Sequence, residues 1–194
     1  MSAQSDVSEG GGPGGPATGP PAGGRLTRTV ALVGLMGVGK STVGRKLAES
    51  VSAQFIDSDE EIEKAAGLSV QEIFDRLGEP EFRRGERRVI ERLLNGPPIV
   101  LATGGGAYMD AETRALMKEK ATTVWLRADI ETIWKRVSRR DTRPLLKRDN
   151  PKQVLADLNA ARAPVYAEAD IVVDSGDGPA TEAVKAIREA LGLK

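Results

Sequence analysis

The chain has 194 residues, enough for one sizeable hydrophobic core, and it carries 28 basic against 28 acidic residues. This balance argues against a general binder of nucleic acids or membrane surfaces, because such proteins usually have a basic excess. The absence of cysteine excludes disulfides and thiolate chemistry and fits a reducing compartment. Histidine is also absent, so proton transfer near neutral pH must use a carboxylate, a lysine or water.

The beginning of the chain differs in composition from the rest. Residues 1–25 are rich in Gly, Pro, Ser and Ala and are predicted to form a disordered tail. Residues 26–194 are predicted to form a single domain. The start lacks the pattern of a signal peptide, and no apolar run in the sequence is long enough to cross a bilayer. We therefore expect a soluble, cytoplasmic protein.

Short apolar stretches alternate with longer amphipathic segments along the remaining chain. The candidate strands are residues 29–33, 54–57, 97–103, 122–127 and 169–174. Their hydrophobicity is continuous rather than alternating, which indicates burial on both faces and therefore a parallel sheet covered by helices. The pattern predicts an α/β fold with three layers, in which a doubly wound sheet of five strands lies between helices.

Two consecutive helices are predicted between the second and third strands. Ser69, with Glu72 three residues later, forms a capping-box pattern, and Gly78 marks the end of this helix. Pro80 then lies in the first turn of a second helix, and Gly96 lies beyond its end.

A glycine-rich loop follows the first strand. Gly34, Gly39, Lys40 and Ser41 match the pattern GxxxxGK(S/T), in which backbone N–H groups surround phosphate oxygens. The lysine neutralises phosphate charge and the hydroxyl binds magnesium. Because the following segment has helical spacing, the partial positive charge of a helix start also faces the anion. The loop is therefore predicted to bind nucleotide phosphates.

Asp57 and Asp59 lie one residue apart at the end of the second strand. Extended backbone would place both carboxylates on one face. Magnesium bound with nucleotide phosphates usually has one or two carboxylates nearby, so Asp57 with Ser41 could hold the ion and Asp59 could bind substrate. The alternative is an acidic helix start in which Ser58 or Asp59 is the N-cap, and the residues by themselves leave both interpretations open.

Three glycines, Gly104 to Gly106, follow the third strand. Three in a row at the carboxyl end of a strand predict a ligand packed against the main chain. Phosphate-loop enzymes usually have an aspartate after this buried strand. Its absence here assigns the metal carboxylate to Asp57.

Arginines form the third group of candidate residues, since they bind carboxylates and phosphates with two hydrogen bonds. Arg83 lies one helical turn before Glu86, which could hold its guanidinium, although a solvated ion pair is the alternative. Residues 139–151 are dense in charge and contain two prolines, which predicts a mobile lid over the nucleotide. Arg143 on this lid could neutralise the transferred phosphoryl group, and Arg162 is a further candidate of this group.

The motifs GLMGVGKST, DSD, FRRGE, ATGGG, RPLL and RAPVY occur in this order. Their combination, which extends from Thr29 to the C-terminus, closely resembles the shikimate kinase family. The resemblance implies a phosphate-loop fold like that of nucleoside monophosphate kinases. It further implies Mg²⁺-dependent transfer of the ATP γ-phosphoryl group to the 3-hydroxyl of shikimate, which gives shikimate 3-phosphate for aromatic amino acid biosynthesis.

The resemblance also implies a role for each matching residue. The ATP site would comprise Gly37, Val38, Gly39, Lys40, Ser41, Thr42 and Arg143, with Ser41 and Asp57 on the metal. Shikimate would be bound by Asp59 and Gly105 at its ring hydroxyls and by Arg83 and Arg162 at its carboxylate. The expected catalytic residues are Lys40, Asp59 and Arg143, with Asp59 as the candidate base. Arg139 and Arg140 compete for the place near adenine.

Three other functions are compatible with a phosphate loop. A kinase for another polyol acid, such as gluconate, is disfavoured by TGGG together with FRxxE. A GTP-dependent switch protein usually carries an NKxD segment, which this sequence lacks. A catalytically silent ATP-binding module is disfavoured because Lys40, Ser41, Asp57 and Asp59 are all retained. ATP and shikimate are the expected partners, and a monomer is expected because no exposed apolar stripe is evident.

Overall fold

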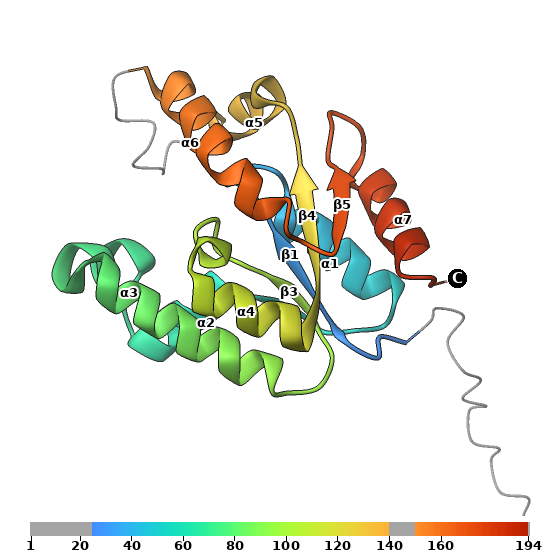
Figure 1. Cartoon of the computed structure of the whole chain (residues 1–194), viewed down its shortest axis with the longest axis horizontal. Helices are drawn as coiled ribbons and strands as arrows, with labels where there is room; N and C mark the ends of the chain where they lie inside the picture. The colour runs from blue at the N-terminus through green and yellow to red at the C-terminus, as the bar shows by residue number, and fades with distance from the viewer. Residues whose placement is uncertain (1–24, 140–149, 194) are drawn as a thin grey trace, which may run out of the picture.

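The computed structural model describes residues 25–139 and 150–193. Each strand is followed along the chain by one or two helices (Figure 1). The elements are β1 (Thr29–Val33), α1 (Lys40–Ser50), β2 (Phe55–Asp57), α2 (Ser58–Ala66), α3 (Val70–Leu94), β3 (Val100–Ala102), the 3₁₀ helix η1 (Ala107–Met109), α4 (Ala111–Lys120), β4 (Ala121–Arg127), α5 (Ile130–Val137), α6 (Pro151–Tyr166), β5 (Ile171–Asp174) and α7 (Ala180–Ala190).

The five strands form one parallel sheet in the order β2-β3-β1-β4-β5. The predicted five-stranded parallel sheet is therefore confirmed. β1 lies in the middle, and the chain moves from β1 toward one edge first and toward the other edge later. Ligands of such sheets collect at the carboxyl ends of the strands where the order reverses, which here is the loop after β1.

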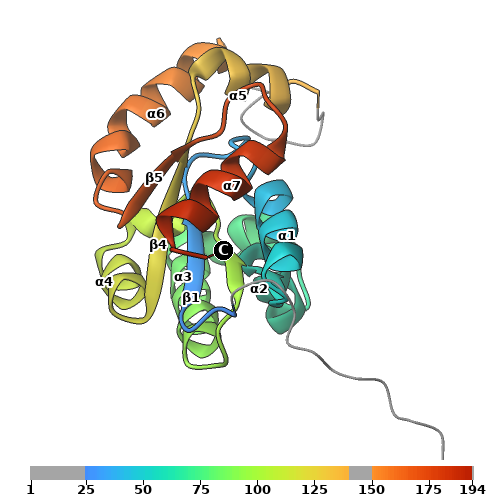
Figure 2. The same ribbon diagram turned by 90° about the vertical axis from the view of Figure 1, so that its right-hand side faces the viewer.

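Helices cover both faces of this sheet (Figure 2). Val30 and Leu32 of β1 belong to a core cluster shared with α1 and α7, whereas Ala31 belongs to a second cluster shared with α3 and α4. This alternation follows from the period of two along a strand. The central strands β1 and β3 are buried throughout, as continuous hydrophobicity predicted.

The edge strands do not follow that prediction. All three residues of β2 are partly exposed, and Val172 of β5 is 45% exposed. An edge strand has a neighbour on only one side, so solvent reaches side chains that a central strand would bury. Hydrophobicity alone did not separate central strands from edge strands.

The two helices predicted between β2 and β3 join directly within α3. Ser69 and Glu72 form the predicted capping box, and Gly78 has a non-helical backbone with φ 81° and ψ 168°. Pro80 begins the second part, as expected for a residue that needs no N–H partner in a first turn. The bend brings the first part of α3 alongside the carboxyl ends of the strands.

Two sequence predictions concern residues beyond those described. The predicted tail, residues 1–25, includes only Arg25 among the described residues, and most of the predicted lid, residues 139–151, also lies outside them. Of the helices within the described part of the chain, none has the length and hydrophobicity needed to span a membrane.

Candidate active site

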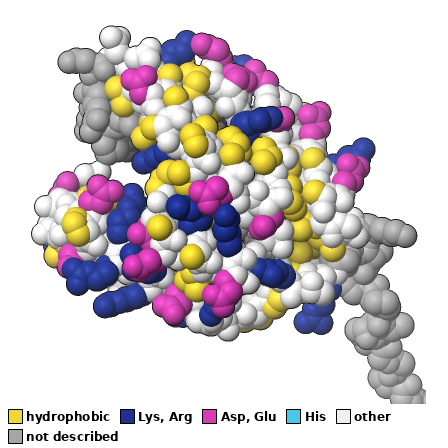
Figure 3. All heavy atoms as spheres, viewed as in Figure 1, with side chains coloured by type: hydrophobic (Ala, Val, Ile, Leu, Met, Phe, Trp, Pro, Cys, Tyr) yellow, Lys and Arg dark blue, Asp and Glu magenta, His cyan; other side chains and the backbone are white. Residues whose placement is uncertain are grey.

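A cleft of about 1570 Å³ lies at the carboxyl ends of the strands. The molecular surface is hollowed between the beginning of α3 and α6 (Figure 3). The cleft is lined by nine of the residues predicted for the site: Gly37, Gly39, Lys40, Ser41, Thr42, Asp57, Asp59, Gly105 and Arg162. The structure therefore brings together residues from β1 to α6 at one place.

Three predicted residues are not part of this lining. Val38 has its side chain buried in the core, so only its main chain could contact a nucleotide. Arg83 lies against Gly106, where a Cβ on that glycine would clash with the Arg83 guanidinium. Arg143, together with Arg140, lies outside the described residues. Arg139, the other candidate for the adenine position, does line the cleft.

The loop between β1 and α1 has the backbone that its glycines permit. Gly34, Gly37 and Gly39 have φ values of 135°, 82° and 101°, a region that residues with a Cβ rarely adopt. Gly39 is the N-cap of α1, so the first N–H groups of this helix point toward the cleft. Lys40 Nζ donates to the carbonyl oxygens of Gly34 at 2.8 Å and Leu35 at 3.0 Å, which folds its charge over the loop.

Ser41 and Asp57 meet at the start of α1. The Ser41 hydroxyl donates to Asp57 Oδ2 at 2.8 Å, and Asp57 Oδ1 accepts from the backbone N–H of Asp59 at 3.1 Å. Asp57 is therefore the N-cap of α2, and neither Ser58 nor Asp59 has that role. The expectation that extended backbone places Asp57 and Asp59 on one face was wrong, because α2 begins at Ser58. Their carboxylates nevertheless line the same cleft.

Asp59 is a partly buried carboxylate. Its Oδ1 has no hydrogen-bond partner within the described part of the chain. Burial, followed by the charge of Asp57, raises the pKa of Asp59, and the nearby Lys40 and Arg83 only partly oppose this increase. A carboxyl group with a raised pKa and a free oxygen in a cleft is suited to accept a hydrogen bond or a proton from a ligand hydroxyl.

Glu86 contacts the Arg83 guanidinium in a buried position. This agrees with the prediction that Glu86 holds Arg83 in place and not with the alternative of a solvated ion pair. Arg83 Nη1 lies 2.6 Å from Glu86 Oε2, and the Glu86 side chain is only 2% exposed. Arg83 also donates to Glu79 Oε1 at 3.2 Å. Burial raises the pKa of Glu86, and the charge of Arg83 opposes this rise. The second oxygen of Glu86, Oε1, has no partner among the described residues.

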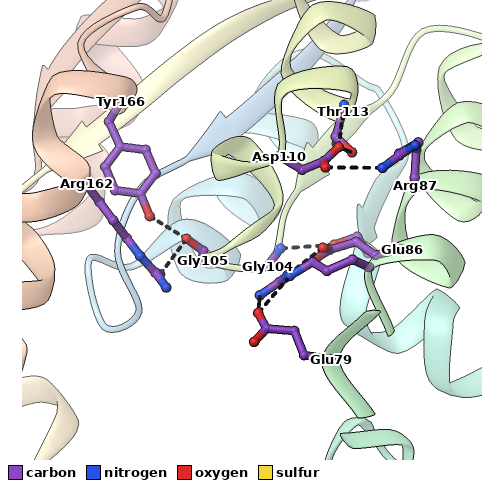
Figure 4. Close-up of polar contacts among 11 residues, drawn as sticks. Glu79, Glu86, Arg87, Gly104, Gly105, Asp110, Thr113, Arg162 and Tyr166 are labelled. Carbon is purple, nitrogen blue, oxygen red and sulfur yellow. Dashed lines mark hydrogen bonds and ion pairs between the residues drawn. The ribbon is translucent and has the colours of Figure 1, made fainter. Parts of the chain in front are cut away.

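The glycines after β3 pack against these side chains (Figure 4). A Cβ on Gly104 would lie 2.8 Å from Asp59 Oδ1 and 2.9 Å from Glu86 Oε1, so the two unpartnered oxygens converge above this glycine. The Gly104 N–H donates to Ser58 Oγ at 3.1 Å. Ser58, which had no assigned role, thus joins the loop after β3 to the acidic start of α2.

Helix α6 reaches the same loop from the opposite side (Figure 4). The carbonyl oxygen of Gly105 accepts from Arg162 Nη1 at 3.0 Å and from the Tyr166 hydroxyl at 2.5 Å. Burial raises the pKa of Tyr166, and its ring stacks on Trp125 with centroids 5.9 Å apart. Sequence reasoning missed Tyr166, although it ends the RAPVY motif and follows Arg162 by one helical turn.

Arg136 of α5 is the second residue that sequence reasoning missed. It lines the cleft and donates to the carbonyl oxygen of Val38 at 3.0 Å. Ser175, which follows β5, donates to the same oxygen at 2.8 Å. No motif distinguishes either residue, since their partner in the phosphate loop is far away in the sequence.

Known proteins resemble this chain along most of its length. A family model described as shikimate kinase matches residues 36–192. The shikimate kinase of Caulobacter vibrioides strain NA1000 / CB15N is 59% identical over 164 residues, covering 84% of this chain and 82% of that protein. The shikimate kinase of Paramagnetospirillum magneticum is 54% identical over 168 residues, covering 87% of this chain and 86% of that protein.

A solved structure agrees with these matches. The shikimate kinase from Acinetobacter baumannii in complex with shikimate superposes with a TM-score of 0.80 at 40% identity. The match covers 85% of this chain and 93% of the Acinetobacter baumannii chain. The family match, the identity to these relatives and the cleft described above agree, and the chain belongs to the shikimate kinase family.

Proposed function

We propose that this chain transfers the γ-phosphoryl group of ATP to the 3-hydroxyl of shikimate, with the nucleotide and the acceptor bound at opposite ends of one cleft. Membership of the shikimate kinase family makes it an ATP-dependent kinase acting on shikimate. One observation supports the assignment of residues most directly. The phosphate loop, Asp59 and Arg162 line a single cleft, although they come from elements far apart in the sequence.

The phosphate loop forms the nucleotide end. The positive φ of Gly37 and Gly39 lets the main chain curve around an anion, and the N-terminus of α1 adds partial positive charge. Lys40 neutralises phosphate charge as the phosphoryl group moves. We assign this neutralising role to Arg143 as well, on the basis of its motif. Phosphoryl transfer depends mainly on such positioning and charge neutralisation.

Ser41 and Asp57 suit a magnesium ion. Their hydroxyl and carboxylate lie 2.8 Å apart beside the phosphate loop, and both are hard oxygen ligands. No group of three or more acidic, cysteine or histidine residues that could hold a metal occurs in the described part of the chain. This donor set fits Mg²⁺, which commonly binds through one or two carboxylates, substrate phosphates and water. When bound, Mg²⁺ supplies charge that neutralises the phosphates.

Asp59 and two arginines form the acceptor end. The unpartnered Oδ1 of Asp59 can accept the proton of a shikimate hydroxyl, and no histidine exists to replace it. Arg162 and Arg83 provide guanidinium groups on opposite sides of the glycine loop for a carboxylate. Gly105 lies between them, where its main chain can contact ring hydroxyls. The acceptor that fits this set is a small acid with several hydroxyls.

We further propose that the enzyme acts as a monomer in the cytoplasm. Among the described residues, the large apolar side chains that are exposed are Leu77 and Val172, which come from different elements. Two such residues do not make the apolar patch that a stable dimer needs. The lack of cysteine fits a reducing compartment, where ATP is also supplied.

The test is a coupled assay of ADP release with ATP and Mg²⁺. Shikimate, gluconate, AMP and buffer are compared as acceptors, and a parallel series replaces Mg²⁺ with a chelator. We expect ADP release with shikimate at a rate at least about 100-fold above the buffer, and loss of activity with the chelator, because the charge of the phosphates is then not neutralised.

Each comparison in this assay has an outcome that would contradict a different part of the proposal. ADP release driven by gluconate or AMP, with shikimate inert, would overturn the acceptor while leaving the fold intact. Equal release with every acceptor and with buffer would indicate an ATPase. Full activity in the chelator would contradict the assignment of Ser41 and Asp57 to a metal.

A further inference from the structure

Arg136 and Ser175 bind one carbonyl oxygen of the phosphate loop, and neither has a role in the proposed reaction. Ser175 Oγ donates to the carbonyl oxygen of Val38 at 2.8 Å, and Arg136 Nη1 donates to the same oxygen at 3.0 Å. A Cβ on Gly39 would lie 3.7 Å from Ser175 Oγ and 3.8 Å from Arg136 Nη1, so both groups lie beside Gly39 as well.

Both donors are themselves held firmly. Ser175 is 7% exposed, and its N–H donates to the carbonyl oxygen of Arg127 at 2.6 Å. Arg136 also donates to the carbonyl oxygens of Ser175 at 3.2 Å and of Gly176. The loop after β5 and helix α5 thus hold one side of the phosphate loop.

The geometry of the peptide unit gives this support a consequence for the ligand. In a trans peptide the C=O and the following N–H point in opposite directions. Fixing the Val38 carbonyl toward Arg136 and Ser175 therefore directs the Gly39 N–H away from them. Gly39 lines the cleft and is the N-cap of α1, so its N–H is directed to the place where phosphate oxygens bind.

This peptide needs such support because of its glycine. Gly39 has φ 101°, and a glycine tolerates almost any other φ at little cost. The Val38–Gly39 peptide could therefore rotate with small changes elsewhere in the backbone. Rotation would turn the carbonyl oxygen, which carries partial negative charge, toward the phosphates and would remove one donor.

We propose that Arg136 and Ser175 are positioning residues that hold the Val38–Gly39 peptide with its N–H directed at the nucleotide phosphates. The inference rests on the proposed function, since it requires a nucleotide at the phosphate loop. It extends that function because two residues outside the phosphate-loop motif would fix the direction of a backbone N–H donor within the loop.

The test measures phosphate affinity apart from the base and ribose. Calorimetry compares wild type, Ser175→Ala and Arg136→Met for binding of Mg²⁺–ADP and of inorganic tripolyphosphate. We expect Kd to increase about 5- to 10-fold for Ser175→Ala and more for Arg136→Met, with both ligands, because a lost donor lets the peptide rotate. The KM for ATP should increase while the KM for shikimate stays within about 2-fold.

Conservative and neighbouring variants serve as controls. Ser175→Thr keeps the hydroxyl and should restore most of the affinity. Ser138→Ala and Lys135→Met change exposed side chains of the same types near Arg136 and should leave both Kd values unchanged. A loss of ADP affinity with unchanged tripolyphosphate affinity would overturn the proposal in favour of contacts to the base or ribose.

A measurement on the wild-type protein needs no variant. The Gly39 amide proton should move downfield in an NMR titration with tripolyphosphate, as expected for a new charge-assisted hydrogen bond. Absence of this shift, while other amides of the loop respond, would overturn the proposal. If wild type binds neither Mg²⁺–ADP nor tripolyphosphate, the proposed kinase function fails together with the positioning role. If wild type binds both ligands but the variants bind them equally well, only the positioning role fails.

Discussion

At the scale of single residues, the site depends on a buried carboxylate, Glu86, and a partly buried one, Asp59, that both lie against Gly104. Asp59 Oδ1 and Glu86 Oε1 both point at Gly104 and have no partner among the described residues. Arg83 binds the other oxygen of Glu86, Oε2, at 2.6 Å. Burial raises the pKa of both carboxyl groups, but only Asp59 lines the cleft. This makes Asp59 the better candidate for a proton acceptor.

The Asp59→Asn variant tests two properties of Asp59: its role in catalysis, through kcat, and the effect of its burial, through the free energy of unfolding. Loss of the proton acceptor should lower kcat by about 100-fold or more, while shikimate still binds. Because the phosphoryl-transfer transition state is loose, a smaller loss would mean that positioning matters more than the base. Normal shikimate binding together with wild-type turnover would show that Asp59 has no such role.

The same variant has a predictable effect on stability. Because the folded-state pKa of Asp59 is raised, the folded protein binds more protons than the unfolded chain between the ordinary pKa of aspartate and the raised value. Wild-type stability therefore falls as pH increases through that window. Asp59→Asn lacks this term, so its free energy of unfolding relative to wild type should increase with pH there. Urea unfolding at several pH values measures the difference, and a difference independent of pH would contradict it.

At the scale of elements, the junction of β1 and α1 depends on glycines for two different reasons. Gly39 needs its positive φ to begin α1, with little crowding around it. Gly37 also has positive φ, and a Cβ there would lie 2.5 Å from Val137 Cγ2 and 3.2 Å from Ile133 Cγ2. Helix α5 therefore packs directly against the phosphate loop, and this contact leaves no space for a side chain.

Gly37→Ala should therefore destabilise the protein more than a Gly→Ala change at a position where the only cost is the strained backbone. Gly67 is a matched control, since it has φ 66° and no atom lies within 4 Å of a Cβ placed on it. We expect Gly67→Ala to cost about 1 kcal/mol of unfolding free energy and Gly37→Ala about 1–3 kcal/mol more, because it adds a core clash. Urea unfolding compares the two variants. Equal losses would show that α5 does not restrain the loop.

At the scale of the whole molecule, the strand order assembles the site. β1 lies between β3 and β4, so the loops after β1 and β3 are neighbours, and β2 places the acidic start of α2 beside them. Helix α6 adds Arg162 from a distant part of the sequence. Among the described residues, the first one in the core is Leu26, which is 8% exposed and packs in the cluster around β1.

A chain that begins at Arg25 should therefore keep its stability and activity. We expect the free energy of unfolding to change by less than about 0.5 kcal/mol, because residues 1–24 are rich in Gly, Pro, Ser and Ala and have few large apolar side chains. kcat and both KM values should stay within about 2-fold of the full chain. A change in KM for ATP or shikimate beyond that range would mean that residues 1–24 contribute to the site, contrary to the sequence prediction.

Much of the fold and site could be predicted because the relevant signals are local. The phosphate loop, the capping box at Ser69 and the helix break at Gly78 each follow from a few neighbouring residues that limit the backbone. The alternation of apolar strands and amphipathic segments predicted the parallel sheet. Arg83 and Glu86 could be paired because one helical turn separates them.

The remaining features depend on contacts between residues far apart in the sequence. The cap at Asp57 was missed because an aspartate that ends a strand and one that begins a helix look alike in sequence. Arg136 and Ser175 lie 98 and 137 positions from Val38, and only the order of the strands brings them against the phosphate loop. The sequence by itself determined which segments bend, pair and bind phosphate, since these depend on local backbone preferences. The tertiary structure alone decided which distant side chains support them, because packing and not local propensity sets those contacts.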